Sequence, residues 1–216
     1  MKIAEGQILN VFKPKGPTSF DIVEEIRKLS GIKKVGHGGT LDPLASGVLV
    51  IGLGREATKK LDEVVQKEKE YVVVVKLGEN SVTDDEEGQK EKISDKEPDK
   101  EEIEQILKNF IGLIDQVPPQ FSAVKVGGRK AYQAARKGQA IDLKPRQVEI
   151  KEIKVLDYRY PLLKLKVTTG KGVYIRSLAR DLGRKLKTGG YVKSLKRTRV
   201  GEFKIEDSVK LKDFTI

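Results

Sequence analysis

The clearest hydrophobic pattern in the chain is a set of apolar runs rich in β-branched residues. Residues 48–51 and 71–77 are almost continuously apolar, and each predicts a buried strand because Val and Ile favour the pleated surface of a sheet. Further segments with weaker or alternating patterns also predict strands, and these are 6–12, 121–126, 146–157, 162–168 and 191–200. The chain therefore contains enough predicted strands for one sizeable sheet.

Apolar residues at helical spacing separate these strands. They predict helices at 19–29, 56–65, after Pro98, at 132–137 and at 174–186. Ser19 is the expected N-cap of the first helix, and Gly31 is its expected end. Strands and helices follow one another without a regular βαβ rhythm. We therefore expect an α+β fold with a mixed, mostly antiparallel sheet and flanking helices.

Length and composition narrow the class of protein. The 216 residues predict one catalytic domain, 1–216, with an acidic loop-helix insertion at about 84–110. The chain has no cysteine and one histidine, which excludes disulfides, thiolate metal sites and multi-histidine metal sites. It has no apolar run near the roughly 18 residues that span a bilayer, and no apolar signal-peptide core. We expect a cytoplasmic protein without a membrane segment.

Charge is distributed unevenly along the chain. The formal net charge is +11, yet residues 84–104 hold eleven acidic residues and four lysines. Residues 125–199 hold 22 basic and five acidic residues. A one-sided basic field favours a polyanionic partner, with nucleic acid as the first candidate, although lysine-rich surfaces also serve solubility.

The segment 36–49, Gly-His-Gly-Gly-Thr-Leu-Asp-Pro-Leu-Ala-Ser-Gly-Val-Leu, is the most informative part of the sequence. It contains the single histidine, His37, and one carboxylate, Asp42. Glycines before Asp42 allow positive φ angles and close approach of a ligand, and Pro43 favours an extended backbone at Asp42. The loop then runs into the buried strand at 48–51. This arrangement suits a catalytic carboxylate at the mouth of a cleft, although an aspartate here is also a common turn cap.

Other side chains are candidates for chemistry, each with a plainer alternative. Arg176 lies in the first turn of a predicted helix; if it approached Asp42, its charge would keep that carboxylate ionised and suited to act as nucleophile or base. Tyr71 could stack on a base or handle a proton, or it could be a core tyrosine. His37 could fill the space left by a flipped base, or bond to a carbonyl in its loop.

Several basic residues are candidate phosphate contacts, although each one alone could be an ordinary surface charge. They are Lys13, Lys15, Lys125, Arg129, Lys130 and Arg146. The glycines at 36–39 match neither a dinucleotide fingerprint nor a P-loop.

Taken together, the ordered segments resemble the TruB family of tRNA pseudouridine synthases over nearly the whole chain. The motif Leu-Ala-Ser-Gly at 44–47 resembles the bacterial branch of this family. The segments that carry the resemblance are 13–19 (KPKGPTS), 36–49, 54–59 (GREATK), 69–71 with 77–78, 83–85 with Gly88, 116–138, 170–183 and 195–203.

The resemblance implies isomerisation of uridine to pseudouridine at position 55, in the T-loop of tRNA, without metal or organic cofactor. The family's catalytic aspartate falls on Asp42, and its active-site tyrosine falls on Tyr71. The paired tyrosine and arginine fall on Tyr174 and Arg176. The histidine that inserts beside the flipped nucleotide falls on His37, and the lysine that supports the active-site loop falls on Lys13.

The resemblance also marks departures and alternatives. Gly38 stands where the family usually has threonine or a similar small polar residue, and we expect it to loosen the loop. The family often carries a C-terminal RNA-binding PUA domain, and we expect none that is complete here. The partner implied is the T-arm of tRNA, bound by a monomer. The main alternative function is non-catalytic RNA binding or tRNA folding on the same fold. An aspartate-dependent hydrolase of a small substrate disagrees with the basic charge, and the sequence offers no second well-placed carboxylate for it.

Overall fold

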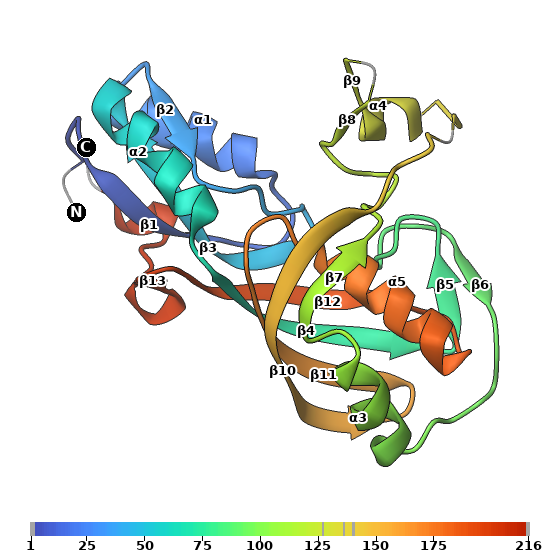
Figure 1. Cartoon of the computed structure of the whole chain (residues 1–216). Coiled ribbons are helices and arrows are strands. Elements are labelled where there is room, and N and C mark those ends of the chain that lie inside the picture. The colour runs from blue at the N-terminus through green and yellow to red at the C-terminus, as the bar shows by residue number, and fades with distance from the viewer. Residues whose placement is uncertain (1–2, 127, 136, 140, 215–216) are drawn as a thin grey trace. The chain divides into compact units, whose positions relative to one another are not determined.

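The fold is described from a computed structural model of the chain. The structure describes residues 3–126, 128–135, 137–139 and 141–214, without the side chains of residues 125, 126, 129 and 130. The chain forms two compact units (Figure 1). One contains residues 3–72 and 195–214, and the other contains residues 73–194. Strands β4 (Lys69–Leu77) and β12 (Gly190–Val200) contribute residues to both units.

The first unit is built around β3 (Ala45–Leu53), which pairs antiparallel with β1 (Ile8–Lys13) and parallel with residues 195–197 of β12. Two shorter strands add to these pairings, β2 (Val35–His37) on β3 and β13 (Phe203–Lys204) on β12. The helical elements of this unit are α1 (Ser19–Ser30), α2 (Gly54–Gln66) and two 3₁₀ turns, Ile205–Asp207 and Leu211–Asp213.

Strand β3 is buried on both faces, which explains its continuous apolar run. Leu49, Ile51 and Leu53 pack with α1 residues in one core cluster. Val48 and Val50 alternate with them and pack with α2 residues in another cluster. Because side chains alternate along a strand, each helix covers one face of the sheet here.

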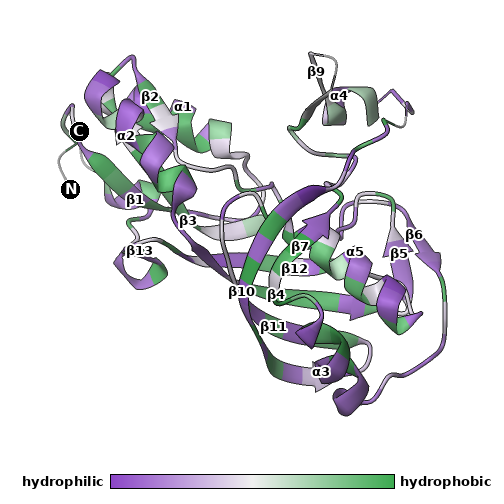
Figure 2. Ribbon diagram, in the orientation of Figure 1, coloured by the Kyte–Doolittle hydropathy of each residue, from purple (hydrophilic) through white to green (hydrophobic). Residues whose placement is uncertain are grey.

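The second unit has antiparallel strands in the order β11 (Leu162–Thr169), β10 (Arg146–Arg159) and β7 (Gly112–Gln116). Figure 2 shows hydrophobic and hydrophilic residues alternating along β10. The helices of this unit are α3 (Lys100–Lys108), α4 (Ala131–Ala135) and α5 (Ile175–Leu186). Two small hairpins complete it, β5 (Glu79–Ser81) with β6 (Lys90–Lys92), and β8 (Lys125–Val126) with β9 (Arg129–Lys130).

The predicted α+β fold with a mixed, mostly antiparallel sheet and flanking helices is confirmed. The predicted strand at 121–126 is shortened to two residues, because 121 and 122 form bends and 123 and 124 have no regular structure. Strands β2, β5, β6 and β7 were not predicted, since three to five residues give too little pattern. No helix in the described ranges is long and apolar enough to span a membrane.

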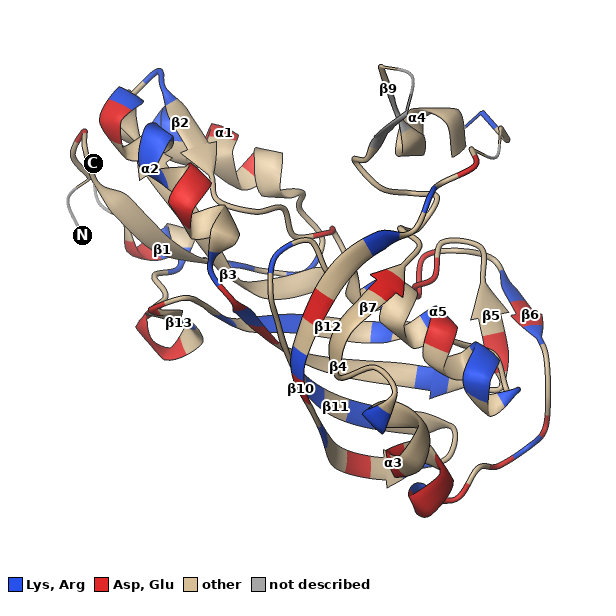
Figure 3. Ribbon diagram, viewed as in Figure 1, with Lys and Arg blue, Asp and Glu red and all other residues tan. Residues whose placement is uncertain are grey.

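Charged residues of both signs lie on several elements of the second unit. Figure 3 shows acidic residues on α3 and, mixed with lysines, on the segment before it; β11 carries only basic charges, and β10 carries both signs. The expected insertion at 84–110 thus contains β6 and α3.

Candidate active site

Asp42 lies in the short loop between β2 and β3, and its backbone is fixed at both sides. Its carbonyl accepts a hydrogen bond from Ala45 N–H at 3.0 Å, which closes a tight turn into β3. Before it, Gly39 has a φ of 102°, so one of the glycines before Asp42 takes the left-handed conformation that the sequence predicted. The Asp42 side chain is half-buried.

The start of α1 holds this loop through Ser19. The Ser19 hydroxyl donates to the Leu41 carbonyl at 2.9 Å and accepts from the Leu41 N–H at 2.8 Å. Ser19 was predicted to be the N-cap, and this is wrong: Thr18 is the N-cap, in a capping box with Asp21. The hydroxyl of Ser19, one residue later, is therefore used for the Asp42 loop.

The turn between β1 and α1 makes a second contact with the loop. Gly16 N–H donates to the Pro43 carbonyl at 2.9 Å. Lys13 holds this turn, because its ammonium donates to the carbonyls of Pro14 at 2.9 Å and Pro17 at 2.7 Å. Lys13 is fully buried, so its prediction as a phosphate contact is wrong. Its contacts agree instead with the loop-supporting role that the resemblance implied.

His37 and Tyr71 lie in the same unit as Asp42. His37 ends β2, and its pKa is lowered by burial and by the positive charge of Arg197, so the imidazole is neutral at pH 7. Its Nδ1 has no hydrogen-bond partner among the described residues. Tyr71 is 8% exposed, on the buried face of β4. A neutral imidazole and a tyrosine ring are both suited to stacking on a base.

Tyr174 and Arg176 lie in the other unit, at the start of α5. The amide of Gln116 fixes Tyr174: Gln116 Nε2 donates to the Tyr174 carbonyl at 3.1 Å, and Tyr174 N–H donates to Gln116 Oε1 at 2.8 Å. Tyr174 also packs against a small core cluster of Val124 and Leu143. The sequence analysis assigned no role to Gln116, because a glutamine in an extended segment carries no signal for such a contact.

Arg176 is buried and has several partners within its own unit. It donates to the carbonyls of Thr83 at 3.2 Å and Phe121 at 2.9 Å. Its Nη1 lies 3.4 Å from Asp85 Oδ2, and both side chains are almost inaccessible to solvent. The predicted approach of Arg176 to Asp42 would join the two units and stays a prediction.

Asp85 is a supporting residue that the sequence analysis quoted in a motif but did not assign. One of its oxygens accepts from the Thr83 hydroxyl at 2.5 Å and from the Glu87 N–H at 3.0 Å, while the other faces Arg176. The carboxylate thereby orders its own loop and neutralises the arginine. The signal that could have found it is the run Thr83-Asp84-Asp85 followed by Gly88.

The remaining phosphate candidates are dispersed. Lys15 is exposed in the turn before α1, and Arg146 is exposed at the start of β10. The side chains of Lys125, Arg129 and Lys130 lie outside the described part of the structure, although their backbone forms the β8–β9 hairpin. Within the described residues, no group of three or more His, Asp or Glu side chains could hold a metal ion.

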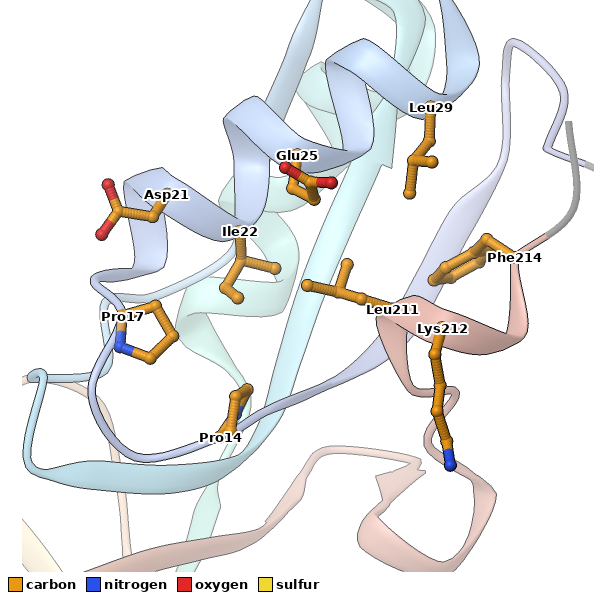
Figure 4. Close-up of a pocket in the computed structure, with 9 residues that line it drawn as sticks. All are labelled: Pro14, Pro17, Asp21, Ile22, Glu25, Leu29, Leu211, Lys212 and Phe214. Carbon is orange, nitrogen blue, oxygen red and sulfur yellow. The ribbon is translucent and has the colours of Figure 1, made fainter.

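A groove of about 540 Å³ opens elsewhere in the first unit, between α1 and the 3₁₀ turn at Leu211–Asp213 (Figure 4). It is lined by Pro14, Pro17, Asp21, Ile22, Glu25, Leu29, Leu211, Lys212 and Phe214. None of the predicted site residues that the structure describes lines it. The groove and the Asp42 loop both adjoin α1 and the turn before it.

Two family models match this chain. A model described as "TruB family pseudouridylate synthase (N terminal domain)" matches residues 27–175, and one described as "tRNA pseudouridylate synthase B C-terminal domain" matches residues 176–216. A tRNA pseudouridine synthase B from Wolbachia pipientis subsp. Culex pipiens is 46% identical over 209 residues, covering 96% of this chain and 59% of that protein. The protein of the same name from Parabacteroides distasonis is 44% identical over 213 residues, covering 95% and 90%.

Solved structures agree with this result. A chain from a crystal structure of a Cbf5-Nop10-Gar1 complex has a TM-score of 0.75 and 32% sequence identity, covering 95% of this chain and 52% of its own length. A chain from an H/ACA RNP bound to a substrate RNA containing 2'-deoxyuridine has a TM-score of 0.71 and 29% identity, covering 95% and 51%. The chain belongs to the TruB family of pseudouridylate synthases.

Proposed function

We propose that this protein isomerises uridine to pseudouridine at position 55, in the T-loop of tRNA. The observation that carries the proposal is the half-buried carboxylate of Asp42 on a loop fixed through Ser19 and Gly16, in a chain of this family. Relatives that carry the name tRNA pseudouridine synthase B support the substrate class. A fixed loop suits catalysis because a carboxylate must meet its target atom in one geometry.

The proposed reaction breaks the bond between the ribose anomeric carbon and N1 of uracil and forms a bond from that carbon to C5. The proton on C5 is lost, and N1 gains one, so substrate and product have the same composition. Asp42 acts first, either by attacking the anomeric carbon or by removing a sugar proton. Tyr71 helps to remove the C5 proton, and Arg176 keeps the Asp42 carboxylate ionised.

The target uridine must leave the T-loop stack before Asp42 can reach it. Extrusion costs a few kcal/mol, which is offset by contacts between basic side chains and RNA phosphates. We assign this role to the exposed Lys15 and Arg146, together with Lys125, Arg129 and Lys130. The neutral ring of His37 fills the space that the extruded base leaves.

The T-arm of tRNA is the proposed partner, and the chain would bind it as a monomer. One structural neighbour is bound to a substrate RNA, which supports an RNA ligand for this fold. Because the substrate is tRNA, we infer a cytoplasmic location. No metal or organic cofactor enters the proposed reaction.

The test is incubation of the purified protein with an unmodified transcript of the T-arm stem-loop. Because the two isomers have the same mass, pseudouridine is labelled with acrylonitrile before it is mapped by mass spectrometry. Wild type should convert the uridine at position 55, and Asp42→Asn should lose conversion by several orders of magnitude while it still binds the RNA. Asp62→Asn, a change at an exposed carboxylate on α2, is the matched control and should convert normally. RNA binding by wild type without any product would instead favour the non-catalytic function.

A further inference from the structure

Strand β3 changes its partner along one of its edges. β1 occupies the other edge throughout. On this edge β12 pairs with residues 45–47, and β2 pairs with residues 51–53. The carbonyls of Val48 and Val50 lie between these two pairings. Gly38 N–H donates to the Val50 carbonyl at 2.8 Å, which leaves the Val48 carbonyl to be satisfied by another group.

The guanidinium of Arg197 fills this break in the sheet. Arg197 Nε donates to the Val48 carbonyl at 2.8 Å. The other two nitrogens reach the loop before Asp42: Nη2 donates to the Gly39 carbonyl at 3.0 Å, and Nη1 donates to the Thr40 carbonyl at 3.3 Å. One planar side chain therefore joins β3 to the loop.

Arg197 is a buried cation held by backbone carbonyls. It is 2% exposed, and no carboxylate pairs with it among the described residues. Burying a charge without an opposite charge is costly, so such a residue is expected where its geometry is needed. The rigid fork of guanidinium donors matches several acceptors at once, which an ammonium does not.

Gly47 fixes the position from which Arg197 reaches the loop. A Cβ built on Gly47 would lie 2.1 Å from the Arg197 carbonyl oxygen, and Gly47 has a φ of 114°. Only glycine permits this close approach of the two backbones. The Arg197 backbone therefore lies directly against β3, and its side chain starts from a fixed position.

We infer that Arg197 is a positioning residue, which orients Asp42 by holding the carbonyls of Gly39 and Thr40. The inference rests on the proposed function for its kinetic consequence. The Ser19 hydroxyl holds Leu41, the next residue along the chain. Arg197 and Ser19 together therefore fix the three residues that precede Asp42. Arg197 is too buried to contact RNA, so it acts on the rate and leaves RNA binding to other residues.

The kinetic test compares Arg197→Lys and Arg197→Gln with wild type in multiple-turnover reactions over a range of T-arm RNA concentrations, so that kcat and KM are measured separately. Misplacement of a catalytic group by about 1 Å costs on the order of 100-fold, so kcat should fall by about that factor. KM for the RNA should stay within about twofold, because the lost interaction acts on the chemical step. Arg199→Lys is the matched control: Arg199 lies on the same strand but bonds Glu68 and Gly201, and its variant should react normally.

A second measurement does not depend on activity. Amide hydrogen exchange at Gly38 and Leu41 should accelerate at least about tenfold in Arg197→Lys and not in Arg199→Lys, because local opening of the loop is the predicted defect. The single histidine is a further marker: the pKa of His37 should rise in Arg197→Gln, which removes the nearby charge, and stay near its wild-type value in Arg197→Lys.

These outcomes separate the two proposals. A wild-type protein that makes no pseudouridine refutes the proposed function, while faster exchange in Arg197→Lys would still support Arg197 as the residue that holds the loop. Normal kcat and normal exchange in both Arg197 variants would overturn the inference. Loss of cooperative unfolding in both variants would overturn it as well, because Arg197 would then maintain the fold and not the geometry of one loop.

Discussion

Val64 of α2 fills the space that a side chain on Gly38 would need. A Cβ built on Gly38 would lie 2.9 Å from Val64 Cγ1 and 3.2 Å from Val64 Cβ. The sequence led us to expect a looser loop at this glycine. The structure instead holds Gly38 by this packing and by its hydrogen bond to the Val50 carbonyl. Because Gly38 has no side chain, Val64 can approach this closely.

We predict that Gly38→Ala destabilises the protein by about 1–3 kcal/mol, because it overpacks the contact with α2. In a Val64→Ala background the same change should cost clearly less, since the smaller side chain leaves room for the new methyl group. Urea unfolding of the four proteins in this double-mutant cycle measures the coupling. Gly36→Ala is the control, because its Cβ would meet Leu61 and Thr58 at an ordinary 3.5 Å. Additive costs in the cycle would contradict the assigned contact.

Ser19→Ala should affect both stability and rate. The change removes both hydrogen bonds to Leu41 and leaves its N–H and carbonyl buried without that partner, at a cost of about 1–3 kcal/mol. We also expect a lower kcat for pseudouridine formation, because Leu41, the residue before Asp42, is no longer held by the Ser19 hydroxyl. Ser30→Ala is the matched control at the other end of α1, where the hydroxyl accepts only from Ile32 N–H. Equal effects of the two serine variants would disprove a special role for Ser19.

The local features of the fold could be predicted because they depend on neighbouring residues. The apolar run at 48–51 indicates a buried strand, and the glycines before Asp42 indicate an unusual turn. The contacts that hold the turn could not be predicted, because Ser19 and Arg197 reach it from distant parts of the sequence. Hydrophobic periodicity carries no information on such polar tertiary contacts.

The same limit applies to Arg176. Its place at the start of a helix was predicted from the glycine-flanked segment before it. Its buried partner Asp85 comes from a loop in an acidic stretch, and aspartate side chains are rarely buried. Only tertiary packing selects one carboxylate of that stretch for burial.

Asp85→Ala is predicted to destabilise the protein by about 3–5 kcal/mol, because it removes a buried carboxylate that faces the buried Arg176 cation. The matched control is Asp95→Ala, which removes an exposed ion pair with Lys92 and should cost less than about 1 kcal/mol. Chemical denaturation of both variants provides the comparison. Similar costs for the two would mean that the Asp85–Arg176 pair contributes no more than a surface pair.

Lys69 provides a test of electrostatics in the other unit. It is 7% exposed, and its ammonium donates to the carbonyls of Val65 at 2.5 Å and Lys67 at 2.6 Å, at the end of α2. Burial and then the charge of Arg197 lower the pKa of Lys69 from 10.5 to about 8. The protonated form is therefore less favourable in the folded chain than in the unfolded chain.

Between pH 8 and pH 10.5 the unfolded chain binds more protons at Lys69 than the folded chain, so this residue makes stability rise with pH in that window. The complete gain in the free energy of unfolding is about 3 kcal/mol. It is absent below pH 8, where Lys69 is protonated in both the folded and the unfolded chain. We predict that wild type gains stability relative to Lys69→Met, which has no titrating group, as pH increases from 7.5 to 10. Urea unfolding of both proteins across this range measures the gain. Parallel stability curves would show that the Lys69 ammonium is not destabilised by burial, and would also argue against a strong field from Arg197 at this position.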